Sequence, residues 1–192
     1  MSMSYNVFLN DIDDSKIQDW ISELNKLEMD CEVHPEFSFK SQTGFLPFKI
    51  KIHENTHESL KNKDYLTGFE FYLDSFDLEE SSEYQEQSFF EKLLKKPKIK
   101  LPFHSEEIDQ RLKDKKYVVT FNFGISDTFE LRMASLASAT LAKISGGVCC
   151  YAYDDLWYDN ETVIDQLLRD VSEYEKSLKE REFRIHAFEE WL

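Results

Sequence analysis

Alternating apolar and polar positions predict six short strands along the chain. Val119, Phe121 and Phe123, for example, are separated by single polar residues. A side-chain period of two places one face of a strand in a core and the other face in water. One of the strands is interrupted by Pro35, a residue that is tolerated at a sheet edge. The expected strands cover residues 5–9, 33–39, 48–52, 69–73, 117–123 and 148–153.

Apolar residues at three- and four-residue spacing predict three helices. The first follows the capping side chains of Asp13-Asp14-Ser15, because Asp and Ser bond the free amides at a helix start. The second follows Ser126 or Asp127 for the same reason. The third begins near Glu161, and residues 159–192 are expected to form a C-terminal helical segment.

The second helix is expected to lie close to the sheet. It contains four alanines, whose small side chains let the helix backbone approach a neighbouring layer. Gly146-Gly147 ends the helix, because glycine adopts the left-handed cap conformation without a Cβ penalty. The block from residue 117 to residue 153 therefore predicts a strand–helix–strand unit. The alanines are Ala134, Ala137, Ala139 and Ala142.

The order of these elements predicts an α+β fold. Strands outnumber helices, and hairpins are mixed with helical crossovers, which favours a single-domain sandwich over residues 1–192. Helices would cover one face of a mainly antiparallel sheet, in an arrangement of the ferredoxin-like kind. Residues 77–104 are expected to form a variable excursion from the sheet, with a short helix around residues 84–94.

The composition excludes several classes of protein. Of the 192 residues 41% are hydrophobic, which is enough for a core and excludes wholesale disorder. The 38 Asp and Glu residues outnumber the 23 Lys and Arg residues and give a formal charge of −15. This sign repels phosphates, so we expect no nucleic-acid partner. No segment approaches the ~20 apolar residues of a membrane helix, so we also expect no membrane partner.

We expect a cytoplasmic protein without a cofactor. The first residues lack the basic region and apolar run of a secretory signal. The vicinal pair Cys149-Cys150 would bridge only with strain, so these two cysteines and Cys31 are expected to be reduced thiols. At least one of the pair is expected to be a small buried hydrophobe. Gly146-Gly147 follows a helix rather than preceding one, so it is not a phosphate-binding loop.

The letters H-E-x-x-H occur at residues 53–57. In metalloproteases a helix places two such histidines on one face, where they bind zinc while the Glu acts as general base. Here a strand pattern leads directly into His53, and the two residues between Glu54 and His57 are Asn and Thr, which are poor helix formers. We therefore expect a solvated loop. A zinc-dependent hydrolase that uses His53, Glu54 and His57 is the alternative.

Acidic residues gather in two places, one of them rich in aromatic residues. The first is the run from residue 70 to residue 91, which contains no Lys or Arg. The second is the expected connection between the last strand and the last helix. Acids near a helix start are explained by capping and by the helix dipole, whereas Trp and Tyr beside acids are also typical of an interface for a basic partner. The candidate partner-binding residues are Glu79, Glu80, Glu83, Asp154, Asp155, Trp157 and Asp159.

The region from residue 117 to Tyr158 resembles part of the small acidic bacterial immunity proteins of polymorphic toxin systems. The resembling features are the alternating strand, the Ala- and Leu-rich helix that ends Leu141-Ala142-Lys143-Ile144-Ser145-Gly146-Gly147, and the strand that leads into Tyr153-Asp154-Asp155. They cover about a fifth of the chain. The resemblance implies a non-catalytic inhibitor that binds a toxin domain tightly.

Charge and resemblance together predict a non-catalytic acidic binding protein. We expect it to occlude a basic protein partner at the active site of a toxin domain, because many toxins act on nucleic acid through basic clefts and opposite potentials speed association. A structural or adaptor subunit of a larger assembly is a further alternative.

Overall fold

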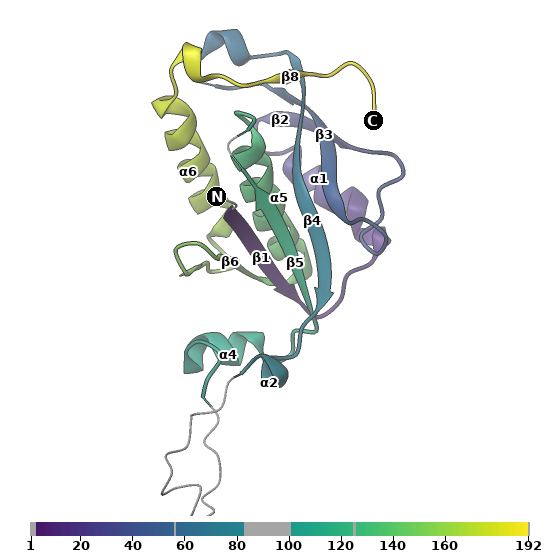
Figure 1. The fold of residues 1–192 in the computed structure, drawn as a ribbon, viewed down its shortest axis with the longest axis vertical. Helices are drawn as coiled ribbons and strands as arrows, with labels where there is room; N and C mark the ends of the chain where they lie inside the picture. The colour runs from purple at the N-terminus through teal and green to yellow at the C-terminus, as the bar shows by residue number, and fades with distance from the viewer. Residues whose placement is uncertain (1–2, 56, 83–100, 125, 192) are drawn as a thin grey trace, which may run out of the picture.

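The computed structural model describes residues 3–55, 57–82, 101–124 and 126–191, and in these residues eight strands form one sheet (Figure 1). The strand order is β2-β3-β4-β5-β1-β6-β7, and β8 pairs with β4 beyond the end of β5. Every pairing between the described strands is antiparallel. The strands are β1 (Met3–Leu9), β2 (Met29–Val33), β3 (Gly44–Ile52), β4 (Asp64–Ser75), β5 (Tyr117–Phe123), β6 (Val148–Tyr151), β7 (Leu156–Trp157) and β8 (His186–Ala187).

Three of the helices lie on one face of this sheet, which confirms the predicted α+β class. In Figure 1, α5 lies behind the central strands, with α6 on one side of it and α1 on the other. The central order β4-β5-β1-β6, with α1 after β1 and α5 between β5 and β6, is that of a ferredoxin-like core, here extended by β2, β3 and β7. The helices are α1 (Ile17–Leu24), α2 (Leu78–Ser81), α4 (Glu106–Leu112), α5 (Glu130–Ser145) and α6 (Val163–Ser177), with short 3-10 turns η1 (Asp14–Lys16), η2 (Glu58–Leu60) and η3 (Glu180–Glu182).

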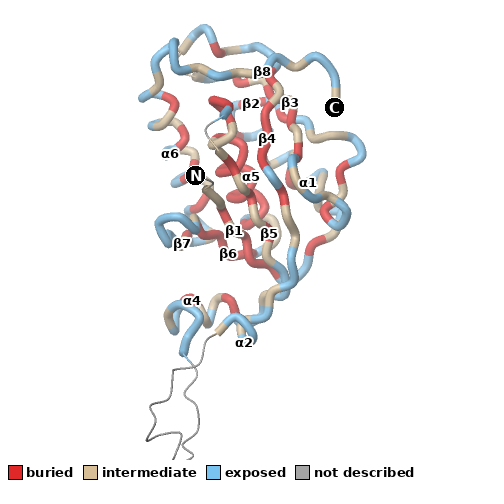
Figure 2. Tube along the Cα trace, viewed as in Figure 1, coloured by how far each residue is buried: buried red, intermediate tan, exposed pale blue. Residues whose placement is uncertain are grey.

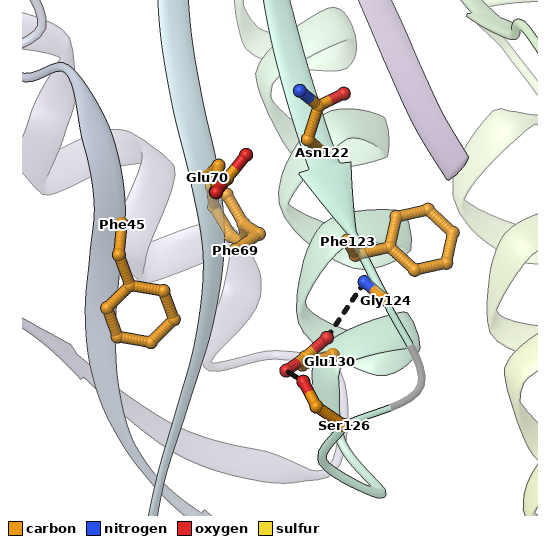
Figure 3. A pocket seen from close by; sticks show the side chains of 8 residues that line it. All are labelled: Phe45, Phe69, Glu70, Asn122, Phe123, Gly124, Ser126 and Glu130. Carbon is orange, nitrogen blue, oxygen red and sulfur yellow. Dashed lines mark hydrogen bonds between the residues drawn. The ribbon is translucent and has the colours of Figure 1, made fainter. Parts of the chain in front are cut away.

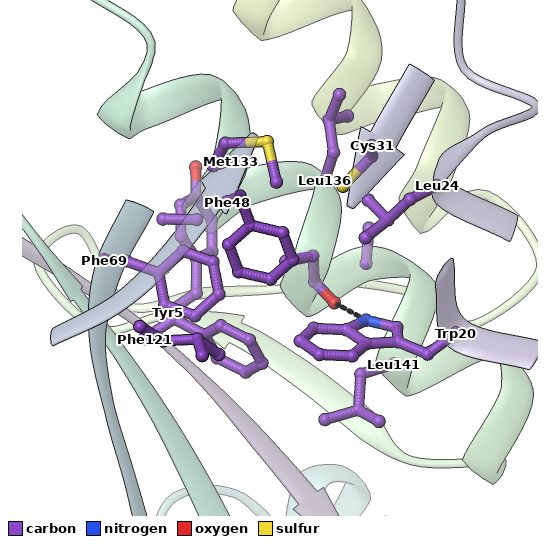
Figure 4. Close-up of a cluster of buried hydrophobic side chains, with 14 of the residues drawn as sticks. Tyr5, Trp20, Leu24, Cys31, Phe48, Phe69, Phe121, Met133, Leu136 and Leu141 are labelled. Atoms are coloured by element: carbon purple, nitrogen blue, oxygen red, sulfur yellow. Dashed lines mark hydrogen bonds between the residues drawn. The ribbon is translucent and has the colours of Figure 1, made fainter. Parts of the chain in front are cut away.

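Helix α5 is buried on almost every side. The four alanines that the sequence analysis singled out, Ala134, Ala137, Ala139 and Ala142, have no exposed surface, as the sequence led us to expect. The indole of Trp20 on α1 donates to the main-chain oxygen of Ala137 at 2.9 Å (Figure 4). The buried hydroxyl of Thr140 donates back to its own helix at Leu136, 2.7 Å away. These bonds satisfy polar groups that would otherwise be costly inside the core.

Several predicted elements differ in extent from the structure. The second strand is β2, which ends before Pro35, and the aromatic residues Phe37 and Phe39 that follow it pack around Trp20 without belonging to a strand. Helix α5 begins with Phe129 as N-cap rather than Ser126 or Asp127, although the Asp127 carboxylate accepts the Phe129 amide at 2.7 Å.

The predicted helical segment 159–192 is wrong beyond residue 177. Helix α6 ends at Ser177, and the chain continues through η3 into the extended strand β8. Phe183 and Ile185 pack against the main core with one residue between them, which is strand periodicity rather than helix periodicity. The predicted helix at residues 84–94, inside the excursion 77–104, lies outside the described residues.

The sheet face opposite α5 carries a smaller apolar cluster at one end. Its buried members are Phe8, Ile108, Leu112, Val148 and Cys150, and α4 covers them. Figure 2 shows this end in its lower part, where α4 and α2 lie below the sheet. None of the helices in the described ranges is both long enough and apolar enough to cross a lipid bilayer.

A buried ion pair joins α5 to α6. Arg132 of α5 donates to both carboxylate oxygens of Glu175 on α6, at 2.7 and 2.8 Å, and each side chain is only 4% exposed. A bidentate pair of this kind fixes the relative position of two helices because both bonds must be aligned together. It also leaves a buried charge without a partner if either residue is removed.

We expect Glu175→Ala to lower the free energy of unfolding by about 3–5 kcal/mol, because Arg132 would be left as an unpaired buried charge. Replacing both members, as Arg132→Met with Glu175→Leu, should recover most of that loss, since no buried charge then remains. Urea denaturation followed by circular dichroism measures both values. A loss below about 1 kcal/mol in the single variant would contradict a buried, paired charge.

Candidate binding surfaces

Three of the candidate partner residues, Asp154, Asp155 and Trp157, belong to a hairpin instead of a strand-to-helix connection. Asp155 lies in the turn between β6 and β7 with φ of 54°, and its carboxylate accepts the indole of Trp157 at 2.8 Å. His104 Nε2 lies 2.8 Å from the other carboxylate oxygen. These hydrogen bonds, first from His104 and then from Trp157, hold the pKa of Asp155 below its ordinary value. Trp157 in turn stacks on Phe8, with ring centroids 5.7 Å apart.

Asp154 and Asp159 have different surroundings. Asp154 is exposed at the hairpin turn. Asp159 precedes α6, and its carboxylate accepts the main-chain amide of Glu161 at 2.9 Å. This bond closes the turn that leads into α6, whose N-cap is Thr162 without a side-chain hydrogen bond, so Asp159 orders the turn before the helix and does not cap it.

The mid-chain acids lie at the same end of the molecule as the hairpin. Glu79 and Glu80 form the first turn of α2, where their amides donate to the Asp77 carboxylate at 2.7 and 3.1 Å. Leu78 of this helix and Trp157 of the hairpin both pack against the smaller apolar cluster. Glu83 lies outside the described residues. We call residues 76–82, 101–117 and 152–157 the hairpin end.

Exposed apolar side chains are concentrated at the hairpin end. The described residues contain six large hydrophobic side chains that are exposed, and five of them lie there. Scattered exposed hydrophobic residues are normal on protein surfaces, whereas a concentration of them at one end makes that end a candidate interaction surface. The five are Leu101, Phe103, Tyr117, Tyr153 and Leu156, between 36% and 57% exposed.

The H-E-x-x-H letters fall in a loop between β3 and η2, not on a helix. His53 Nε2 lies 3.1 Å from Asp30 Oδ1, whereas His57 Nε2 lies 3.2 Å from the main-chain oxygen of Glu175. Asn55 Nδ2 donates to the Glu175 carboxylate at 2.6 Å. Within the described ranges, no group of three or more His, Cys, Asp or Glu side chains is arranged to hold a metal ion. The hydrogen bonds of Asn55 and His57 to Glu175 therefore attach this loop to the end of α6.

We expect Asn55→Ala to lower the free energy of unfolding by about 1.5–3 kcal/mol, because the buried Glu175 carboxylate loses a hydrogen bond to a charged group. His53→Ala is the matched control, and it should cost at most about 0.5 kcal/mol because His53 lies at the surface. Thermal or urea unfolding measures both. If the purified protein held a stoichiometric zinc and His53→Ala abolished it, that result would favour the hydrolase alternative.

The cysteines are buried in the two apolar clusters. Cys149 packs in the main core and Cys150 in the smaller cluster, and Cys31 is also buried and free. Burial raises the pKa of each thiol, to about 12 for Cys150. A thiol with a raised pKa is a poor nucleophile, because only the thiolate reacts. The described surroundings support the role of small buried hydrophobes.

Thiol labelling checks this role. In the folded protein at pH 8, Cys31, Cys149 and Cys150 should react with a disulfide reagent far more slowly than free cysteine, whose pKa is about 8.5. In urea all three should react rapidly, because unfolding exposes them to the reagent. Since the pKa values are raised, labelling of the folded protein should continue to accelerate above pH 9, where the rate for free cysteine levels off. Rapid labelling of one thiol at pH 7 would instead identify an activated cysteine.

A groove on the open sheet face was not found from the sequence. One hollow of about 500 Å³ lies between Phe45 of β3 and Glu130 of α5, with Glu70, Asn122 and Ser126 along its walls (Figure 3). The Glu130 carboxylate accepts the Gly124 amide at 2.8 Å and the Ser126 hydroxyl. These residues are far apart in sequence, and the groove forms where β4 continues beyond its pairing with β5. No local motif predicts such a site.

Comparison with family models, with curated proteins and with solved structures gave no match.

Proposed function

We propose that the protein is a non-catalytic binding protein that captures a basic protein partner with its hairpin end, in the role of an immunity protein that covers the basic active site of a toxin. The observation that carries this proposal is the concentration of exposed apolar side chains at the hairpin end. Such side chains supply buried area in an interface, and a polar rim around them supplies specificity.

The charge of the hairpin end favours a basic partner. Its described residues include nine Asp and Glu and four Lys and Arg, so this end carries a net charge of −5. Two of the basic side chains bond to the body of the protein: Arg111 donates to the main-chain oxygen of Tyr158 at 2.5 Å, and Lys115 donates to that of Gly146 at 2.9 Å. A negative surface raises the association rate with a positive one and disfavours acidic competitors.

The hairpin end is also held in one arrangement before any partner binds. The ring of His104 packs on Trp157 at 5.2 Å and joins the segment before α4 to the hairpin turn at Asp155. Asp109 accepts the amides of Phe103 and His104 at 2.9 and 3.0 Å, which fixes the same segment from the other side. A preorganised surface loses less conformational entropy on binding, which supports tight association.

The resemblance to immunity proteins supports the toxin as partner. It implies an inhibitor without catalysis of its own, and toxins that act on nucleic acid need basic clefts to bind phosphates. An acidic surface that covers such a cleft competes directly with the substrate.

Charge reversal tests the proposal. Glu80→Lys with Asp154→Lys should slow association with the partner about 10- to 100-fold at low salt and flatten the salt dependence of the association rate. Asp165→Lys with Glu173→Lys on the exposed side of α6 is the control for net charge and should change the rate much less. Stopped-flow or surface plasmon resonance measures the rates. The partner is the toxin encoded beside this gene, or the protein that co-purifies stoichiometrically with the full chain from its own cells. Equal rates for the two double variants would dispose of the proposal.

A further inference from the structure

A second acidic surface opens on the sheet face opposite α5 and extends to the start of α5, at the point where β4 continues beyond its pairing with β5. Two adjoining hollows, of about 500 and 440 Å³, share Phe45 and Glu130 in their walls and form one groove along β4. The second hollow lies between β4 and the C-terminal segment, with His186 of β8 in its wall. We call the two together the β4 groove.

Carboxylates from three separate parts of the chain line the β4 groove. Glu70 comes from β4, Asp127 and Glu130 come from the start of α5, and Glu189 and Glu190 come from the C-terminal segment. Among the described residues that line either hollow there is no Lys or Arg. His186 is the one ionisable base among these described residues, and it lies 3.2 Å from Asp127. Asp127 is buried and burial raises its pKa, so the negative charge that the groove presents comes from its four Glu side chains.

A buried hydroxyl and an aromatic ring complete the lining. Thr67 is only 2% exposed, and its hydroxyl makes no hydrogen bond of ordinary length and angle. It lies near Asp127, whose pKa is raised by burial although the neighbouring donors, Thr67 among them, favour the charged form. A buried polar group without such a bond is uncommon and indicates a partner supplied from outside. Phe45 is 49% exposed, and its ring lies against Gly68, where an added Cβ would fall 2.9 Å from Cζ. The ring therefore packs against the backbone of Gly68, beside the acidic side chains.

The C-terminal segment is tied down as a wall of the groove. The amide of Thr128 donates to the main-chain oxygen of Arg184 at 2.6 Å, and the amide of Arg184 donates to the Thr128 hydroxyl at 2.8 Å. Further along, Lys49 lies 5.1 Å above the ring of Phe188. These contacts place Glu189 and Glu190 across from Glu130 in the same hollow.

We infer that the β4 groove binds an extended protein segment that carries Arg or Lys, with the cationic head group between Glu70 and Glu130 and its aliphatic stem on the Phe45 ring. Carboxylates pair with guanidinium groups through charge-assisted hydrogen bonds, and an aromatic face attracts both the cation and its methylene stem. A second copy of this chain would bring a charge of −15 to an acidic groove, so a basic segment is the occupant that the charge favours. The inference rests on the proposed function, since the segment belongs to the same basic partner.

Binding of a model peptide tests the inference without the partner. The probe is an acetylated, amidated Gly-Ser-Arg-Gly-Arg-Ser peptide, titrated into the full-length protein and followed by amide chemical shifts. We expect saturable shifts at Phe45, Gly68 and Gly124. The same peptide with citrulline in place of arginine should bind about tenfold more weakly, because citrulline keeps the shape and loses the charge. Shifts confined to the hairpin end, equal binding of the two peptides or no saturation at millimolar peptide would each overturn the inference.

Two variants and a control locate the site. Glu70→Gln and Phe45→Ala should each weaken the arginine peptide about threefold to tenfold, whereas Glu32→Gln, on the same sheet face outside the groove, should leave its affinity unchanged. Equal effects of all three would indicate a general charge effect and contradict a built site. Failure of this inference is distinct from failure of the proposed function, because the hairpin-end variants Glu80→Lys and Asp154→Lys should slow partner association and leave peptide binding intact.

Discussion

The burial of one helix against one face of the sheet is the constraint on which the rest of the structure depends. Helix α5 packs on the central strands and is flanked by α1 on one side and α6 on the other. Small side chains must therefore line it, and its buried polar groups must form hydrogen bonds within the core. The alanines, the bond from Trp20 to Ala137 and the Arg132–Glu175 pair each satisfy one part of this requirement. Close packing leaves little room for change there, because interiors have the density of organic crystals.

Using one sheet face for the core leaves the other face for recognition. Antiparallel sheets tolerate a wet face, and here that face carries the β4 groove at one place and the smaller apolar cluster under the hairpin end at another. Both surfaces are acidic, and both have exposed aromatic residues beside the acids. The proposed function uses the hairpin end as the surface that captures the partner, and the further inference uses the β4 groove as a site for single basic side chains. Electrostatic attraction would act at long range, and the aromatic contacts would act once water is excluded.

Several residues that the sequence analysis singled out have another role in the folded chain. Asn55 and His57 of the H-E-x-x-H match reach the same buried Glu175 that pairs with Arg132, so a pattern associated with zinc attaches a loop to α6. Asp155 and Trp157, chosen as partner contacts, bond to each other, and Asp159 orders the turn before α6. Asp154, Tyr153 and Leu156 beside them stay exposed. Short polar motifs therefore indicate the region of a candidate surface more reliably than they indicate the individual residues that form it.

The sequence by itself determined the local elements and the sign of the surface. Period-two and period-3.6 patterns predicted most strands and helices, and Gly146 at φ of 62° ends α5 as expected, because these signals act within a few residues. Only the tertiary structure decided that β1 lies between β5 and β6, that the segment after α6 returns to pair His186–Ala187 with β4, and that Glu70, Glu130 and Glu190 meet in one groove. Those outcomes depend on which hydrophobic faces pair across long loops, and that choice is made by burial over the whole chain rather than by any local window.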